Sequence, residues 1–150
     1  VVTYDAFGGY GHPDHIRAHR ITLAAVEAAA FTGLYPEAGP AWRVGTLRLV
    51  TLSLSVVMEA VRRGVWRRGL GTPDEEIDAF VDVRPWLDTK VKALQQHASE
   101  IARGATIKLV LDPAARDGFL GTECYLWRAG PGASRSQREE DDLFRDLRRS

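Results

Sequence analysis

The 150-residue chain has a single cysteine, Cys124, and no net charge, because twenty basic residues balance twenty acidic ones. One cysteine excludes an internal disulfide and is typical of a reducing compartment. Without a global positive field, no nucleic-acid partner is expected. No apolar run approaches the length of a membrane span and no signal peptide is visible, so we expect no membrane association and a cytoplasmic location.

Composition and pattern predict an α/β domain. Apolar residues make up 45% of the chain and charged residues 27%, which is typical of one globular unit with a charged surface. Strand-like and helix-like segments alternate along the chain. Strands are expected at residues 1–4, 46–55 and 77–83, and helices at 16–30, at 56–63 and from Pro85 to Ile101. The four tryptophans are scattered and are expected to pack rather than to bind a ligand.

The segment best suited to carry chemistry follows the first strand. Glycines at positions 8, 9 and 11 permit a tight turn, and His12-Pro13-Asp14-His15 follows where a helical pattern begins. Junctions at the carboxyl ends of parallel strands are where open α/β sheets bind ligands. The position therefore favours a functional site.

The histidines have the spacing and chemistry of metal ligands. A neutral imidazole binds zinc well, and His15 and His19, four residues apart, share one face of a helix. Two histidines at this spacing can hold one metal ion. The alternative reading is structural: His12 caps the turn, Asp14 helps to start the helix, and His19 is a surface or core-edge residue.

The string from Tyr4 to His15, YDAFGGYGHPDH, closely resembles the second motif of the LmbE-like, or PIG-L, zinc deacetylases. Similarity is greatest to the branch that acts in mycothiol metabolism, which includes the N-acetylglucosaminyl-inositol deacetylase and the mycothiol-conjugate amidase. The resemblance continues through residues 16–30, 90–100 and 123–126. It implies a Rossmann-like sheet with flanking helices.

The resemblance also implies roles for motif residues. His15 matches a zinc ligand, and His12 matches the residue that stabilises the oxyanion or protonates the departing amine. Asp14 would orient His12, and Tyr10 matches a mobile tyrosine that assists the polarised carbonyl. Zinc is the implied metal, and imidazole and carboxylate ligands also accept Fe²⁺. These roles suit amide hydrolysis, which needs an activated water, a Lewis acid and an acid for the leaving amine.

One family motif is missing from the chain. The deacetylases carry an amino-terminal His-Pro-Asp-Asp segment that supplies two zinc ligands and the general base, and no such segment occurs here. Residues 1–150 are therefore expected to be the carboxyl-terminal part of a single LmbE-like domain, with the missing amino-terminal half as a required partner. Catalytic zinc normally has three protein ligands, so the chain alone is predicted to be inactive.

A polar line is predicted beside the apolar stripe of the helix that follows Pro85. It comprises Lys90, His97 and Glu100, which face either solvent or the active-site cleft. Relatives present a lysine, a histidine and a glutamine at similar positions, which makes His97 and Glu100 candidate substrate-binding residues. Here Glu100 stands in place of that glutamine. Its carboxylate can only accept hydrogen bonds, whereas an amide also donates them, so the resemblance does not establish that the substrate is the same.

The sequence predicts a zinc-dependent deacetylase of an N-acetylglucosaminyl glycoside, a small-molecule N-acetyl amino sugar. A thiol-conjugate amidase is the second reading, and a non-catalytic binding or assembly domain with a relict motif is the third. A homo-oligomer is compatible with the sequence.

Overall fold

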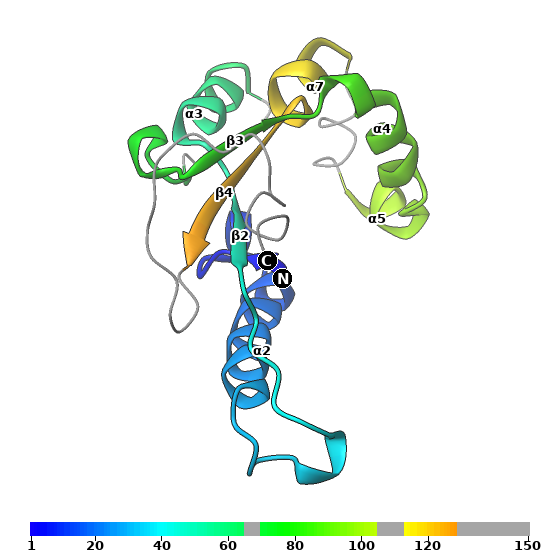
Figure 1. Cartoon of the computed structure of the whole chain (residues 1–150). Coiled ribbons are helices and arrows are strands. Elements are labelled where there is room, and N and C mark those ends of the chain that lie inside the picture. The colour runs from blue at the N-terminus through cyan, green and yellow to red at the C-terminus, as the bar shows by residue number, and fades with distance from the viewer. Residues whose placement is uncertain (65–69, 105–112, 129–150) are drawn as a thin grey trace.

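The computed structural model describes residues 1–64, 70–104 and 113–128. A four-stranded mixed sheet is built from β1 (Val2–Tyr4), β2 (Leu47–Thr51), β3 (Ala79–Asp82) and β4 (Thr122–Arg128) in the order β1-β2-β4-β3 (Figure 1). β1 and β2 run parallel, whereas β4 is antiparallel to both of its neighbours. The predicted α/β fold with flanking helices is confirmed.

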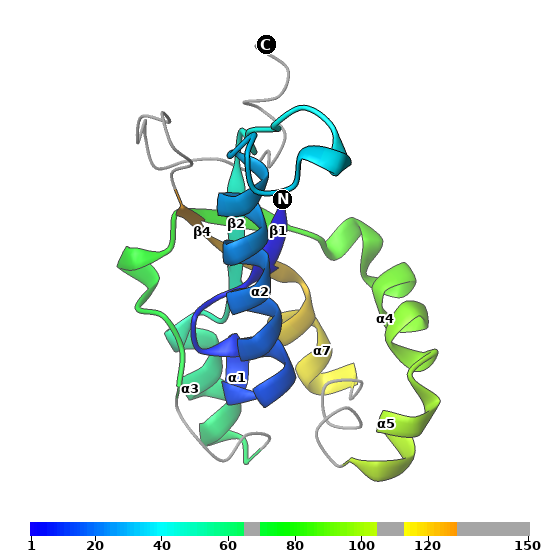
Figure 2. The same cartoon turned by 90° about the horizontal axis from the view of Figure 1, so that it is seen from below.

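Helix α2 (Pro13–Ala29) makes the crossover between the parallel strands β1 and β2. Pro13 suits the first helical turn because its missing N–H would have no intrahelical partner there. The helix runs along the β1 side of the sheet, and the glycine-rich turn α1 (Gly8–Gly11) precedes it at the end of β1 (Figure 2). The crossover thus places the motif residues just beyond the carboxyl end of a parallel strand.

The remaining helices flank the antiparallel part of the sheet. α3 (Leu54–Arg62) follows β2 and contacts α7 (Pro113–Leu120), which leads into β4. α4 (Leu87–Gln95) and α5 (Ala98–Arg103) form an arm to one side (Figures 1 and 2). Short 3-10 turns occupy Pro36–Ala38, Asp74–Glu76 and Arg84–Trp86.

The buried apolar residues lie on or next to the strands β2, β3 and β4 and on the helices α3, α4 and α7. They are Val44, Leu47, Leu49, Val57, Ala60, Ile77, Ala79, Leu87, Leu120, Cys124 and Tyr125. Burial raises the pKa of the Cys124 thiol, which favours its protonated, unreactive form.

Two predicted boundaries were wrong. The strand expected over residues 46–55 ends at Thr51, because the side chain of Ser53 accepts a hydrogen bond from Val56 N and starts α3. The single helix expected from Pro85 to Ile101 is two helices, since α4 closes with hydrogen bonds from Gln96 N to Ala93 O and from His97 N to Leu94 O. These hydrogen bonds join residues three apart, as in a 3-10 helix, and they tighten the last turn of α4.

Core predictions for the arm and for the tryptophans were also partly wrong. Of the apolar stripe on the arm, only Leu87 is buried, because little of the described structure covers the outer part of the arm. Trp42 and Trp86 are more than 60% exposed instead of packed, since both lie in connecting segments. Trp66 lies outside the described residues.

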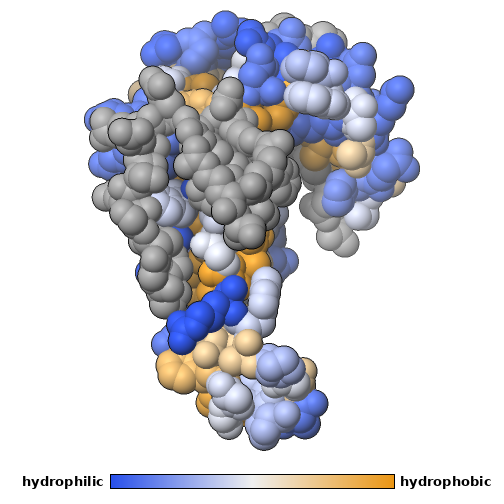
Figure 3. Space-filling model, viewed as in Figure 1, coloured by the Kyte–Doolittle hydropathy of each residue, from blue (hydrophilic) through white to orange (hydrophobic). Residues whose placement is uncertain are grey.

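One face of the molecule shows an uneven distribution of apolar surface (Figure 3). Hydrophilic side chains dominate the part of the molecule that carries α3 and α4, whereas apolar surface gathers around α2 and the segment after it (Figure 3). Exposed apolar residues there are Ile21, Phe31, Leu34, Tyr35 and Trp42. No helix in the described ranges combines the length and apolar character that a membrane span requires.

Candidate functional site

The site is built on the turn between β1 and α2. Gly8 and Gly9 both have φ of 71°, a backbone conformation that disfavours L side chains. Gly8 N donates to Asp5 O at 3.0 Å, which closes the turn directly behind the strand. A Cβ on Gly8 would lie 2.8 Å from Ile16 N, so the turn also approaches the first turn of α2 closely. Glycine is required here for both reasons.

His15 is held in one orientation by the same turn. Its Nδ1 lies 3.2 Å from Gly8 O, and because a carbonyl only accepts, Nδ1 carries the proton in this hydrogen bond. The imidazole also stacks on the Tyr4 ring, with centroids 4.0 Å apart and planes 4° from parallel. The lone pair is therefore on Nε2, which is the state that a neutral histidine ligand needs.

His12 occupies the N-cap of α2. Its Nδ1 accepts a hydrogen bond from Asp14 N at 3.2 Å, so neutral His12 carries its proton on Nε2. The Asp14 carboxylate lies 3.9 Å from the same Nδ1, and its side chain is 90% exposed. If His12 becomes protonated, this carboxylate is the nearest partner for the new Nδ1–H. The cap requires only Nδ1 of neutral His12, which leaves Nε2–H available as a donor.

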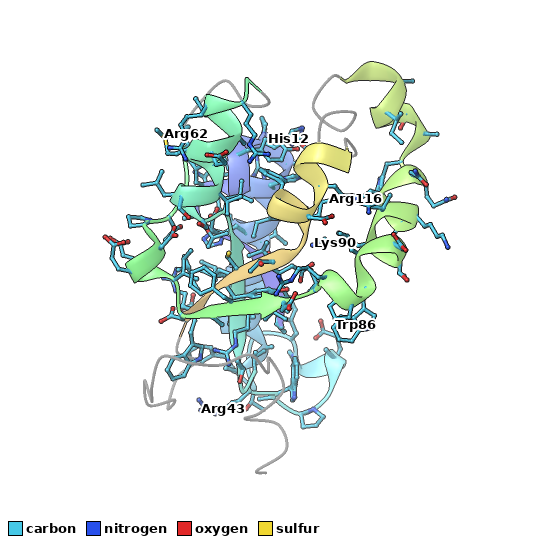
Figure 4. All side chains as sticks on the ribbon, turned by 90° about the horizontal axis from the view of Figure 1, so that it is seen from above. His12, Arg43, Arg62, Trp86, Lys90 and Arg116 are labelled. Carbon is cyan, nitrogen blue, oxygen red and sulfur yellow. The ribbon has the colours of Figure 1, made fainter. Side chains whose placement is uncertain are left out.

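Tyr10 completes a cluster of three rings. The His12 and His15 ring centroids are 4.8 Å apart, and the Tyr10 ring packs edge-on to both, at 5.9 Å from His12 and 5.1 Å from His15. Tyr10 is 47% exposed, and His12 and His15 are half-buried. The structure therefore brings Tyr10, His12 and His15 together on an accessible surface, as the predicted roles require. Figure 4 shows His12 at the opposite end of the molecule from Arg43.

His19 has a structural environment. It is 5% exposed, and its Nδ1 lies 2.8 Å from Tyr4 O, which ties α2 to the end of β1. The core-edge reading describes this contact well. His19 thus fixes the helix that carries His15.

The buried carboxylate of Asp5 stabilises the glycine turn through hydrogen bonds. Asp5 is 8% exposed; its Oδ1 accepts from Gly9 N at 2.9 Å and its Oδ2 accepts from Thr51 Oγ1 at 2.7 Å. Just past the end of β2, Asp74 accepts hydrogen bonds from Ser55 and Ser53, which hold the pKa of that carboxyl below its usual range. Both carboxylates lie where β2 ends.

The residues fit one part of a zinc site. His15 presents the correct tautomer, but the described ranges hold no group of three or more His, Cys, Asp or Glu side chains placed to bind a metal ion. Catalytic zinc usually has three protein ligands and one open position. Within the described residues, the cluster can therefore supply one metal ligand and an acid, but not a complete zinc site.

The structure describes two side chains of the predicted polar line on the arm, those of Lys90 and His97. Lys90 turns toward β4 and donates to Glu123 Oε1 at 2.7 Å and to Leu120 O at 3.1 Å (Figure 4). His97 is exposed and lies in the break between α4 and α5, which separates it from Lys90. Glu100 lies in α5, with its side chain outside the described part. No contact between His97 and the ring cluster is found among the described residues, and the substrate-binding role of Glu100 stays a prediction.

Lys90 instead belongs to a half-buried polar cluster with Glu123 and Tyr125. Burial would raise the pKa of Glu123, but hydrogen bonds from Lys90 and Tyr125 outweigh it, and the pKa lies below its ordinary value. Burial, together with the hydrogen bond donated to Glu123, raises the pKa of Tyr125. The cluster joins α4 to β4.

The sequence analysis did not identify the residues that hold the turn and His15 in place. Tyr4, Asp5 and Thr51 hold the turn and His15, yet none was a candidate site residue. For Asp5 a signal was present, since an acid between an apolar strand and a glycine turn is expected to accept the amides of that turn. Thr51 gave no such signal, because its contact depends on the pairing of two strands that are far apart in sequence.

Comparisons with known proteins identify relatives over nearly the whole chain. The 1D-myo-inositol 2-acetamido-2-deoxy-alpha-D-glucopyranoside deacetylase 3 of Catenulispora acidiphila is 34% identical over 179 residues, covering 99% of this chain and 50% of the relative. Deacetylases of the same name from Rhodococcus jostii and Geodermatophilus obscurus are 35% identical, covering 96% and 98% of this chain. The chain spans about half the length of the curated relatives it matches. No protein-family model matches it.

Proposed function

Because the chain is related over almost its whole length to the 1D-myo-inositol 2-acetamido-2-deoxy-alpha-D-glucopyranoside deacetylases, we propose that it forms part of a zinc-dependent deacetylase. The substrate would be the acetamide of an N-acetylglucosaminyl glycoside. The products would be acetate and the free amine. One observation carries the proposal: His12, His15 and Tyr10 form a ring cluster at the carboxyl end of β1.

His15 is the residue proposed to bind the metal. Its Nδ1–H is committed to Gly8 O, so Nε2 is available as a ligand without loss of an internal hydrogen bond. When bound, zinc would supply a Lewis acid for the acetamide carbonyl and a more acidic water. The remaining ligands and the general base are proposed to come from a His-Pro-Asp-Asp segment outside this chain.

His12 and Tyr10 are proposed to act on the reacting amide. Neutral His12 offers Nε2–H as a donor to the carbonyl oxygen as negative charge develops there. Protonated His12 can deliver a proton to the leaving nitrogen, and Asp14 at 3.9 Å would stabilise that charged form. Tyr10 lies edge-on to both histidines, and its hydroxyl is proposed to assist at the same carbonyl.

The test compares the protein expressed from its complete gene with His15→Ala and with Arg17→Ala, an exposed control change in the same helix. Metal content and release of acetate from 1D-myo-inositol 2-acetamido-2-deoxy-alpha-D-glucopyranoside are measured before chelation, after it and after zinc is returned. We expect about one zinc per chain and zinc-restored activity in the parent and the control, and neither in His15→Ala.

Other outcomes would redirect the proposal. Zinc binding without deacetylation, but with hydrolysis of a thiol-conjugate amide, would identify an amidase with the same machinery. Absence of both zinc and turnover in the parent protein would overturn the hydrolase proposal and favour a binding or assembly role.

A further inference from the structure

Asp5 is the only carboxylate in the described residues that joins the end of β1, the end of β2 and the glycine turn. We propose that Asp5 is a positioning residue that sets the orientation of His15 through the backbone of Gly8 and Gly9. The proposal rests on the proposed function, because it assigns His15 its task as a ligand. Asp5 itself touches no reacting atom.

The route from Asp5 to His15 is short. Asp5 holds the turn at two points, since its backbone carbonyl accepts from Gly8 N at 3.0 Å and its Oδ1 accepts from Gly9 N at 2.9 Å. These two bonds fix the peptide units on either side of Gly8. The Gly8 carbonyl in turn lies 3.2 Å from His15 Nδ1 and selects the tautomer. A rotation of the turn would move that carbonyl and release the imidazole.

A pair of hydroxyls fixes the carboxylate itself. Thr51 donates its only hydroxyl proton to Asp5 Oδ2 at 2.7 Å, so in its 2.7 Å contact with Thr72 Oγ1 it must accept. The order of donation is therefore Thr72 to Thr51 to Asp5. Thr72 is anchored by backbone hydrogen bonds to Leu52 and Leu54 at 2.8 Å each. With one oxygen bound to the turn and the other to this relay, the carboxylate cannot rotate without losing a charge-assisted bond.

The energetic demand on Asp5 argues for a role beyond folding. A carboxylate at 8% exposure loses most of its hydration, which its hydrogen bonds must offset. A glycine turn can be closed by backbone bonds alone, as Gly8 N to Asp5 O shows. The added carboxylate bond holds the next peptide, between Gly8 and Gly9, whose carbonyl is the one that contacts His15 Nδ1.

The experiment uses Asp5→Ala, which removes both side-chain bonds, and Thr51→Val, a milder change that keeps shape but removes the hydroxyl. Thr51→Ser is the rescue variant because it restores the donor. Asp78→Ala is the matched control, since Asp78 Oδ2 also accepts a backbone amide, from Trp127 N at 2.7 Å, beside β3 at the other edge of the sheet. All are made in the protein expressed from its complete gene.

Zinc affinity by chelator competition, kcat and KM are the first readouts. We expect Asp5→Ala and Thr51→Val to lower zinc affinity and kcat by about 10- to 100-fold, the range for groups that orient metal ligands, with KM changed far less. Thr51→Ser should recover most of the loss. Asp78→Ala should lower stability without a change in zinc affinity. Unchanged zinc affinity in folded Asp5→Ala or Thr51→Val, or an equal loss in Asp78→Ala, would overturn the proposal.

A metal-free readout separates this proposal from the proposed function. Nitrogen-15 NMR of the His15 imidazole should show the Nδ1–H tautomer in the apo parent and a mixture of tautomers in Asp5→Ala and Thr51→Val. An unchanged tautomer would refute positioning even if the enzyme is active. A parent protein without zinc or turnover would refute the deacetylase while the tautomer still decides the role of Asp5.

Discussion

The ring of Tyr4 lies flat against the imidazole of His15, with centroids 4.0 Å apart and an interplanar angle of 4°. The carbonyl of Tyr4 accepts a hydrogen bond from His19, one helical turn further along α2, at 2.8 Å. The last residue of β1 therefore fixes both histidines of the helix, one through its side chain and one through its backbone. These two contacts fix the position of α2 relative to β1.

Replacing Tyr4 should separate the stacking contact from the rest of the site. Tyr4→Phe keeps the ring, so zinc affinity and the free energy of unfolding should remain close to those of the parent. Tyr4→Leu loses the stack, which is worth about 0.5–1.5 kcal/mol beyond area burial, and should weaken zinc binding. Denaturant unfolding and chelator competition measure the two effects. Equal behaviour of the two variants would show that stacking does not orient His15.

The two proposed roles of His12, as the N-cap of α2 and as a catalytic acid, should be separable by substitution. His12→Ala should lower the free energy of unfolding by about 1 kcal/mol through loss of the N-cap and lower kcat by about 10²- to 10⁴-fold. His12→Asn should restore stability, since asparagine is a good N-cap, but not kcat. Activity in His12→Asn near that of the parent would show that His12 has only the structural task.

Gly8 should tolerate no side chain. Gly8→Ala places a Cβ 2.8 Å from Ile16 N at a φ of 71° and should cost about 1–3 kcal/mol of stability or more. Gly33→Ala is the control, because its Cβ would meet nothing within 4 Å, and should stay within about 0.5 kcal/mol. Thermal or denaturant unfolding compares them. A neutral Gly8→Ala would mean that the turn can relax away from α2.

Glu123 should give the protein part of its acid sensitivity. Its pKa in the folded protein lies below the ordinary value of 4.5, so its stabilising contribution is present above that pH and is lost as pH falls through the folded pKa. The loss in free energy of unfolding caused by Glu123→Gln should thus be largest near neutral pH and shrink below pH 4.5.

Asp88→Asn provides the control for that series. Asp88 lies 3.7 Å from Arg116 but is 84% exposed, so its removal should have little effect at any pH. Urea unfolding at several pH values tests both variants. A constant difference between Glu123→Gln and the parent across that range would show that this carboxylate does not titrate with folding.

The sequence predicted those elements whose formation depends on residues close together along the chain. The apolar run at residues 1–4 and the glycines with His12 and Pro13 predicted β1, the turn and the start of α2, because turn and capping chemistry act over a few residues. The helix break after Gln95 was missed, because the apolar spacing continues across it and gives no sign of the tightened turn. The end of β2 was missed because alternation continues past the cap residue Ser53.

The sequence by itself determined the α/β class, the position of His12 and His15 between a strand and a helix, and the resemblance to the deacetylases. Each of these depends on residues that lie close together along the chain. Only the tertiary structure decided that Asp5 contacts Thr51, that Lys90 pairs with Glu123, and which nitrogen of His15 is available. These depend on strand order and on the seating of helices on the sheet, through contacts that span 33 and 46 residues in the case of Glu123 and Asp5.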